Sequence, residues 1–309
     1  MRLYVLVIAL FTSLLQADLI SPLPTDTKYD QKKALLGKKL FNDPRLSADD
    51  TISCASCHLL EDGGDDNIKF SFGINAQEGV INSPTVFNSR YNLSQFWDGR
   101  AQDLQAQASQ PIHNPIEMGS NMDEVLSKLK KDPEYSVEFK SIYKDAITKE
   151  NITDAIAEFE KALVTPNSKF DQYLRGDKTA LNKEEKEGYK LFKENGCIAC
   201  HNGINIGGNL YQKVGILKTY VDKKNTLGRY NVTKKEKDKY FFKVPTLRNI
   251  ELTAPYLHDG SQKNLFDIVN FMTLYQIGMV PDKEEVKKIV SFLKTLTGET
   301  PKIMSINEK

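Results

Sequence analysis

Helical periodicity dominates the pattern of hydrophobic and polar positions along this chain. Apolar side chains recur every three or four residues, the spacing that places them on one face of a helix. Two such faces stand out: Ile152, Ile156, Phe159 and Leu163, and then Val286, Ile289, Val290, Leu293 and Leu296. Few segments show the alternation of a strand, so the pattern predicts an all-α protein.

Capping residues predict where these helices begin and end. Asn151 is the predicted N-cap of the first helix, and Asp282 is that of the last one, which Gly298 is predicted to close. Asn182 followed by Glu185 resembles a capping box, which predicts a further helix from residue 183.

Two stretches of the sequence repeat, which predicts two homologous halves. Residues 37–41 (GKKLF) resemble residues 188–192 (GYKLF), and each stretch precedes a pair of cysteines. Pro84 precedes Trp97 by the same number of residues as Pro245 precedes His258. Trp97 and His258 are therefore expected at equivalent places, with the boundary between halves close to residues 165–168.

The first residues resemble a secretory signal peptide rather than part of the fold. Residues 3–15 are almost wholly apolar, and Ala17 ends a plausible cleavage site. This apolar run is too short to span a bilayer. We therefore predict a signal peptide at 1–17, export to the periplasm, and mature domains at 18–166 and 167–309.

The overall charge removes one class of function. The 309 residues contain 42 Lys and Arg against 41 Asp and Glu, a formal net charge of +1. A nucleic-acid-binding protein is expected to carry a basic surplus, which is absent here. The length suits two domains.

The cysteines carry the most specific pattern in the chain. All four lie in two copies of the pentapeptide C-x-x-C-H, which is the attachment signature of c-type haem. The two thiols bind the porphyrin, and the histidine is the proximal iron ligand. A redox-active dithiol or a zinc site would not explain the repeated pentapeptide. The predicted haem-binding residues are Cys54, Cys57, His58, Cys197, Cys200 and His201.

Five further segments, in order along the chain, resemble those of the bacterial di-haem cytochrome c peroxidases. They are residues 82–88 (NSPTVFN), 96–100 (FWDGR), 114–118 (NPIEM), 244–249 (VPTLRN) and 255–260 (PYLHDG). The likeness covers essentially the whole mature chain. It implies two cytochrome c-like domains, each with one covalent haem, and an enzyme that reduces hydrogen peroxide.

The resemblance also implies roles for individual residues. The N-terminal haem would bind peroxide, with Glu117 as general acid/base and Gln107 as a hydrogen-bonding neighbour. Electrons would come from a small cytochrome c or a similar donor, enter at the C-terminal haem, and pass Trp97. Met272 would be the sixth ligand of the C-terminal iron, with Met279 as the alternative.

One calcium ion between the domains is a further implication of the resemblance. Asn82, Thr253 and Pro255 match the family's calcium-binding positions, and their oxygen atoms suit a hard cation. None of the three is a carboxylate, so the residue types alone would not have predicted calcium.

The sequence departs from the family at one position. Many members carry a histidine that blocks the peroxide-binding iron, and Ile74 stands at that place; His113 is the spare imidazole nearest to it in sequence. This leaves open a non-catalytic electron-transfer or redox-sensing protein. A protein-modifying oxidase is disfavoured because such relatives carry Tyr at the Met272 position. The sequence also leaves open whether two copies of the chain form a homodimer.

Overall fold

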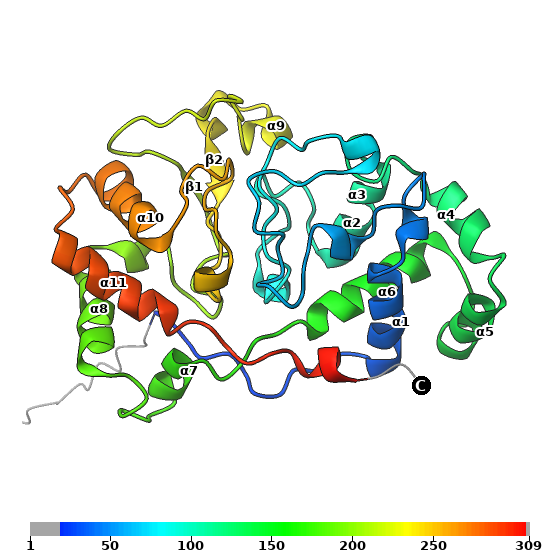
Figure 1. Cartoon of the computed structure of the whole chain (residues 1–309), viewed down its shortest axis with the longest axis horizontal. Helices are drawn as coiled ribbons and strands as arrows, with labels where there is room; N and C mark the ends of the chain where they lie inside the picture. The colour runs from blue at the N-terminus through cyan, green and yellow to red at the C-terminus, as the bar shows by residue number, and fades with distance from the viewer. Residues whose placement is uncertain (1–18, 307–309) are drawn as a thin grey trace, which may run out of the picture.

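The computed structural model describes residues 19–306, so the predicted signal peptide lies outside the described part. The chain forms two mainly helical halves that face each other (Figure 1). The N-terminal half contains α1 (Gln31–Phe41), α2 (Leu104–Ala108), α3 (Gln110–His113), α4 (Met122–Leu129), α5 (Pro133–Ile142) and α6 (Lys149–Ala162). The C-terminal half contains α7 (Lys169–Leu174), α8 (Lys183–Glu194), α9 (Tyr230–Thr233), α10 (Leu265–Met272) and α11 (Lys283–Lys294).

One helix pair forms the framework of each half, and each pair has a glycine at the point where its two helices cross. In the N-terminal half α1 packs on α6, where a Cβ on Gly37 would overlap the carbonyl oxygen of Ala155. In the other half α8 packs on α11, where a Cβ on Gly188 would overlap the carbonyl oxygen of Lys288. The repeated glycines thus allow the same close helix crossing twice.

Aromatic side chains pack beside each crossing. Phe41 meets Phe159 in the N-terminal half, and Phe192 meets Phe292 in the C-terminal half; the ring centroids are 5.2 Å apart in both pairs. The GxKLF segments that repeat in the sequence therefore make the same packing contacts in both halves. Each repeat forms the part of the helix that leads into a cysteine pair.

The predicted helix ends are partly right. Asn182 and Asp282 are N-caps, and Asn182 forms the capping box with Glu185. The prediction for Asn151 is wrong: the cap is Thr148, whose hydroxyl accepts the Asn151 amide, while the Asn151 side chain donates to the Ala146 carbonyl. A hydroxyl three residues upstream therefore begins the helix one turn earlier.

Gly298 does not close the last helix. Helix α11 ends at Lys294, and Gly298 lies four residues further on, where a Cβ would overlap the Thr165 carbonyl oxygen. This glycine does not end a helix; it allows two backbone segments to approach closely.

A small sheet departs from the all-α prediction. Strands β1 (Tyr211–Lys213) and β2 (Phe241–Lys243) pair antiparallel, with Gln212 opposite Phe242. Each strand has three residues, too few for a visible alternation. The sheet lies at the side of the C-terminal half that faces the other half (Figure 1).

Both ends of the described chain cross to the opposite half (Figure 1). Ile20 belongs to the apolar core of the C-terminal half, and the Leu23 amide donates to Asp171. Ile303 belongs to an N-terminal core, and the Lys38 ammonium donates to the Met304 carbonyl. Among residues 19–306, no helix is long and apolar enough to cross a membrane.

Candidate functional site

Each C-x-x-C-H segment folds as a short turn beside a cavity. In the N-terminal half the 3-10 turn Cys54–Ser56 is closed by the His58 amide, which donates to the Cys54 carbonyl at 3.0 Å. In the C-terminal half the turn Cys197–Ala199 is closed in the same way by the His201 amide, also at 3.0 Å. The same local backbone therefore presents two thiols and one imidazole in each half.

The N-terminal cavity has a volume of about 310 Å³. It brings together Cys54, Cys57 and His58 with Gln107 and Glu117, which the sequence had predicted to act on peroxide. Its size and concave shape are in the range of small-molecule and cofactor sites. Residues far apart in the chain thus meet around one space.

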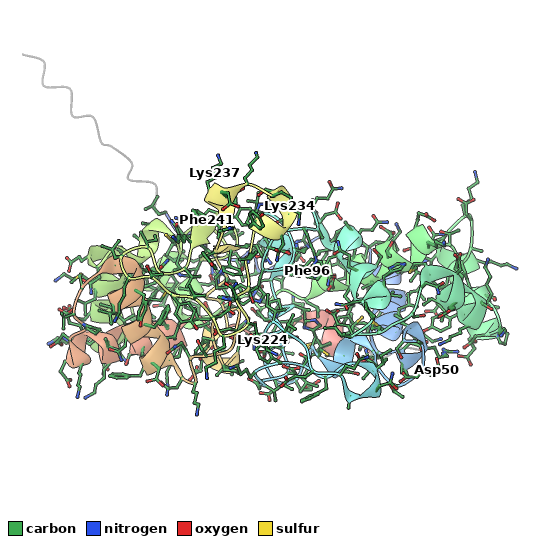
Figure 2. All side chains as sticks on the ribbon, turned by 90° about the horizontal axis from the view of Figure 1, so that it is seen from above. Asp50, Phe96, Lys224, Lys234, Lys237 and Phe241 are labelled. Carbon is green, nitrogen blue, oxygen red and sulfur yellow. The ribbon has the colours of Figure 1, made fainter. Side chains whose placement is uncertain are left out.

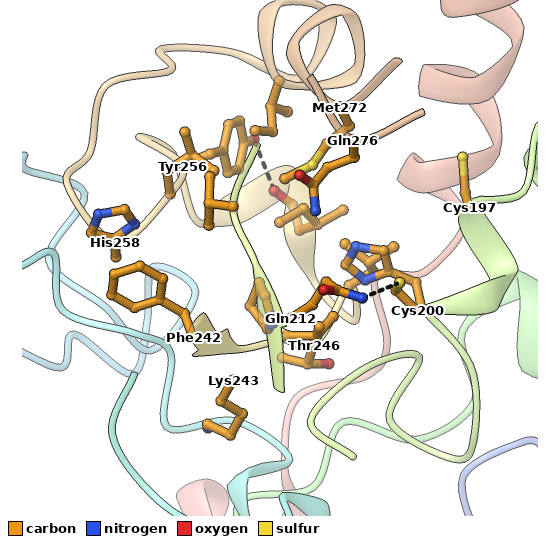
Figure 3. Close-up of a pocket in the computed structure, with 18 of the residues that line it drawn as sticks. Cys197, Cys200, Gln212, Phe242, Lys243, Thr246, Tyr256, His258, Met272 and Gln276 are labelled. Atoms are coloured by element: carbon orange, nitrogen blue, oxygen red, sulfur yellow. Dashed lines mark hydrogen bonds between the residues drawn. The ribbon is translucent and has the colours of Figure 1, made fainter. Parts of the chain in front are cut away.

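The C-terminal cavity is larger, about 460 Å³. It is lined by Cys197, Cys200 and His201, and Met272 at the end of α10 lies in its wall. Figure 3 shows Met272 on one side of this cavity and the two cysteines on another. Met279, the alternative ligand, does not line the cavity and its side chain is 43% exposed.

The proximal histidines have the protonation state that iron binding needs. Burial lowers the pKa of His58, and it lowers the pKa of His201 to about 4, so both imidazoles are neutral. The Nδ1 atom of His58 lies 3.2 Å from the Gly64 carbonyl oxygen, which leaves Nε2 free for a metal. The His201 Nδ1 atom is buried without a hydrogen-bond partner. These cavities and histidines fit covalent haem.

Glu117 is held by a neighbouring amide in the wall of the N-terminal cavity. It follows α3 in the segment that lines the N-terminal cavity, and its Oε1 atom accepts a hydrogen bond of 2.6 Å from the Asn114 amide. Burial raises the pKa of Glu117, opposed by that hydrogen bond and by the Arg100 charge. A carboxyl with a raised pKa exchanges protons closer to neutral pH.

Gln107 and Trp97, to which the resemblance assigned roles, both line a cavity. The Gln107 side chain lines the N-terminal cavity and makes no hydrogen bond to the described residues. Trp97 lines both cavities, and its indole nitrogen donates to the Asn82 carbonyl at 2.9 Å. The indole ring lies edge-on to His258, with 6.3 Å between ring centroids.

A set of residues that we call the shared wall lines both cavities. Its members come from residues 82–97 of one half and from β2 of the other: Asn82, Ser83, Pro84, Thr85, Asn92, Phe96, Trp97, Phe242 and Lys243. The Lys243 amide donates to the Trp97 carbonyl at 2.7 Å, which joins the two contributions. The two cavities are thus separated by one layer of side chains.

Lys243 is a member of the shared wall that the sequence analysis missed. Its side chain is buried, and burial lowers the pKa of its ammonium group to about 8. No ion pair to a described residue balances this cation, and a haem brings two carboxylates. Lys243 is therefore suited to hold a haem propionate. Figure 3 shows Lys243 at the end of the cavity near Phe242.

His258 supports the wall from the C-terminal side. Its ring stacks on Phe242 at 3.9 Å between centroids, and its Nε2 atom lies 2.8 Å from an Asp222 carboxylate oxygen. The Asn82 amide donates to the His258 carbonyl. The repeat predicted that Trp97 and His258 occupy equivalent places in the two halves. In the structure their rings meet edge to face across the boundary between the halves.

The three predicted calcium residues line one cavity. Asn82, Thr253 and Pro255 all border the C-terminal cavity, and so does Asp65, which the sequence analysis missed. Asp65 is only 1% exposed, and its Oδ1 atom has no hydrogen-bond partner. Burial raises the pKa of this carboxyl to about 8, with Asp66 adding to the effect. An orphaned buried carboxyl beside carbonyl oxygens fits a bound cation.

Ile74 and His113 both lie off the N-terminal cavity wall. Ile74 is buried against Gly119, and its amide donates to the Glu117 carbonyl at 2.8 Å. His113 is exposed, and its Nδ1 atom lies 2.7 Å from the Ser109 carbonyl oxygen. Within residues 19–306, His58 is the one histidine that lines this cavity.

The comparisons agree with this geometry. Residues 31–179 match the family described as di-haem cytochrome c peroxidase, and residues 185–297 match cytochrome c. The cytochrome c551 peroxidase of Nitrosomonas europaea is 52% identical over 283 residues, covering 91% of this chain and 85% of that protein. The cytochrome c peroxidase Ccp of Escherichia coli is 50% identical, covering 90% of this chain and 61% of that protein.

A solved structure has the same fold. The crystal structure of a MauG-like protein associated with microbial copper homeostasis matches with a TM-score of 0.79 at 26% identity, covering 91% of this chain and 93% of that one. The paired haem-attachment turns, the two facing cavities and these relatives lead to one conclusion. The chain belongs to the di-haem cytochrome c peroxidase family of enzymes.

Proposed function

We propose that this chain is a periplasmic peroxidase that converts hydrogen peroxide, two electrons and two protons into two waters. The observation that carries the proposal is the mostly buried Glu117 carboxyl, which lines the same cavity as His58 and Gln107. The haems supply electron transfer and activation of the peroxide O–O bond when bound.

Glu117 and Gln107 divide the work on peroxide. The Glu117 carboxylate takes the proton from one peroxide oxygen and gives it to the other, so that the second oxygen leaves as water. The Asn114 amide keeps the carboxyl in one orientation. The free Gln107 amide offers a donor and an acceptor that hold peroxide during this transfer.

Electrons from a small cytochrome c would enter at the C-terminal haem. Met272 would complete the coordination of that iron, and a thioether ligand raises its reduction potential. Apolar side chains gather near the rim of the C-terminal cavity in the loop after β1 and in the segment after α10: Ile216, Leu217, Met279 and Val280 are each at least 43% exposed. Such a patch suits a short-lived complex with a small redox protein.

Trp97 would assist the passage of electrons between the two haems, because it belongs to the shared wall. The exposed lysines Lys234 and Lys237 lie on the outer surface of the segment that carries α9 (Figure 2).

Calcium would bind at the C-terminal cavity through Asn82, Thr253 and Pro255, with Asp65 supplying negative charge. The support is the orphaned Asp65 carboxyl, which lines the same cavity as Asn82, Thr253 and Pro255. We expect purified protein to retain calcium by elemental analysis and Asp65→Asn to lose it. Equal calcium content in both proteins would exclude Asp65 from the site.

Steady-state turnover tests the proposed function. We expect the purified di-haem protein to oxidise reduced small cytochrome c in a peroxide-dependent reaction. The stoichiometry should be two electrons for each peroxide consumed. Absence of this reaction, with both haems bound and reducible, would instead favour the non-catalytic electron-transfer alternative.

The distal side of the N-terminal haem defines a second test. Since Ile74 packs away from the cavity and His113 is exposed, no protein histidine is expected to block the iron in the oxidised enzyme. Electron paramagnetic resonance should then show a high-spin component before any reduction. Two purely low-spin haems, with the N-terminal signal altered by His113→Ala, would overturn the open-site proposal.

A further inference from the structure

Glu160 is a buried acid for which the peroxidase mechanism has no use. It lies in α6, it is 4% exposed, and its side chain lines the N-terminal cavity. Its Oε2 atom has no hydrogen-bond partner among the described residues. An isolated carboxyl of this kind is costly, so its retention beside a cofactor cavity calls for a chemical explanation.

The surroundings of Glu160 offer it no compensating charge. Phe41 and Ile156 line the same cavity, and Cys54 is close enough that the Glu160 charge raises the pKa of its thiol, after the larger effect of burial. Cys54 would attach the porphyrin, so Glu160 would lie near the part of the N-terminal haem that this residue holds.

The ionisable groups on the elements that pack against α6 interact with other partners or lie in solvent. Lys33 pairs with Asp154, Lys38 donates to the Met304 and Ile306 carbonyls, and Arg90 donates to the Lys161 carbonyl. Within residues 19–306, no ionisable group on these elements or around the cavity hydrogen-bonds or ion-pairs with the Glu160 side chain. On the elements that pack against α6 these groups are Lys32, Lys33, Lys38 and Lys39 of α1, Arg90 and Tyr91 of the turn Ser89–Tyr91, and Lys302 of the turn Lys302–Ser305. Around the cavity they are Cys54, Cys57, His58, Asp98, Arg100, Glu117, Lys243 and Tyr230, which precedes the lining residue Asn231. Helix α2 brings no ionisable side chain to this contact.

The haem is then the strongest variable charge near Glu160. Burial raises the pKa of the Glu160 carboxyl to about 8, so the group is poised to exchange a proton near neutral pH. Oxidised haem carries one more positive charge than reduced haem, and a nearby positive charge favours the carboxylate. The pKa of Glu160 must therefore be higher when the haem is reduced than when it is oxidised.

We propose that Glu160 takes up a proton when the N-terminal haem is reduced and releases it when the haem is oxidised. One electron from the donor and one proton from solvent arrive together, and only the O–H bond of Glu160 forms or breaks. The net charge inside the apolar part of the cavity stays constant through the cycle. Glu160 thus acts on the haem through its charge and does not contact peroxide.

The reduction potential of each haem, titrated against pH by absorption spectroscopy, tests this proposal. The N-terminal potential should fall with rising pH between the two pKa values of Glu160, with a limiting slope of about 59 mV for each tenfold fall in proton activity. Glu160→Gln should flatten that slope. Glu150→Gln, an exposed acid in the first turn of the same helix, should retain it.

Infrared difference spectra supply a second measurement that does not require a variant to fold. Reduction of the N-terminal haem in the unmodified protein should add the C=O band of a protonated carboxylic acid. A potential independent of pH between about 6 and about 9, a range that spans the raised pKa of Glu160, or an equal slope in Glu160→Gln, would overturn the proposal. Peroxide turnover is not used in either measurement, so the proposed function stands or falls separately.

Discussion

The two halves of this enzyme share a framework and differ in what faces the second side of each haem cavity. Both cross two helices at a glycine, and both lead from a GxKLF segment to a C-x-x-C-H turn. The N-terminal cavity then presents Glu117 and Gln107, whereas the C-terminal cavity presents Met272. We infer from this difference that the framework attaches haem, and we propose that the opposite wall decides between catalysis and electron transfer.

Glu117→Gln removes the acid that distinguishes the N-terminal cavity, and we expect the largest effect from it. Proton transfer by a positioned carboxyl typically contributes about 10²–10⁴-fold, so turnover should fall by that factor. Both haems should remain bound with nearly unchanged spectra. Steady-state kinetics provide the measurement, and turnover within a few fold of the unmodified enzyme would mean that the halves do not differ in this way.

The pH profile of the same pair of proteins sharpens the assignment. Glu117 must be ionised to take the first proton, and burial raises its pKa. Activity should therefore be low below that pKa and rise as pH increases through it. Glu117→Gln should lack this acidic limb in its residual activity; a limb that persists belongs to another group.

Buried ion pairs offer a second comparison, because within residues 19–306 only the C-terminal half encloses one completely. Arg248 and Asp171 are both 0% exposed and joined by two hydrogen bonds of 3.0 and 3.1 Å. Arg248→Met strands a buried carboxylate and should lower the free energy of unfolding by about 3–5 kcal/mol. The matched change in the N-terminal half is Arg45→Met, whose side chain is 36% exposed.

We expect Arg45→Met to cost less than Arg248→Met, because the Arg45 guanidinium is partly solvated even though its partner Asp43 is only 6% exposed. Chemical denaturation of both variants is the measurement. Equal losses would show that enclosure of the pair does not decide its contribution.

Replacement of Met272 by Leu tests the wall of the C-terminal cavity. Loss of the thioether should lower the potential of that haem by on the order of 0.1 V, a fraction of the roughly 0.8 V over which axial ligands act. The N-terminal potential should change much less. Met279→Leu is the control, since that side chain is exposed; a fall seen with Met279→Leu instead would reverse the assignment.

Alanine at the two crossing glycines probes what the halves have in common. Gly37→Ala and Gly188→Ala each insert a methyl group against a backbone carbonyl of the partner helix. Overpacking of this kind typically costs about 1–3 kcal/mol. Thermal unfolding should show similar losses for both; a loss in one half only would mean that the repeated glycine serves different contacts.

The sequence predicted the parts of this enzyme that depend on local pattern. The haem turns and the capping box at Asn182 follow from residue types at fixed spacing, whereas the ring contact between Trp97 and His258 appears only in the structure. Glu117 and Met272 were placed by resemblance, and the structure puts each in the expected cavity. Their roles stay predictions.

The sequence did not reveal the residues whose importance comes from tertiary burial. Asp65, Glu160 and Lys243 have no motif of their own, and a charged residue in a polar sequence is normally solvated. Only the folded chain shows that all three are enclosed, and that within residues 19–306 one carboxyl oxygen of Asp65 and one of Glu160 lack a hydrogen-bond partner. The helix start at Thr148 was missed for a related reason, because Asn151 and Thr148 are both acceptable caps.

The crossed ends of the chain have a consequence for how the protein is made. The Leu23 amide bonds to Asp171, 148 residues away, and Lys38 bonds to Met304, 266 residues away. Contacts with such separations form late and slow folding, since the intervening chain must be closed into a loop first. Residues 303–304 complete the N-terminal half and residues 20–23 complete the C-terminal half, so cutting the gene between the halves would not yield two independent cytochromes.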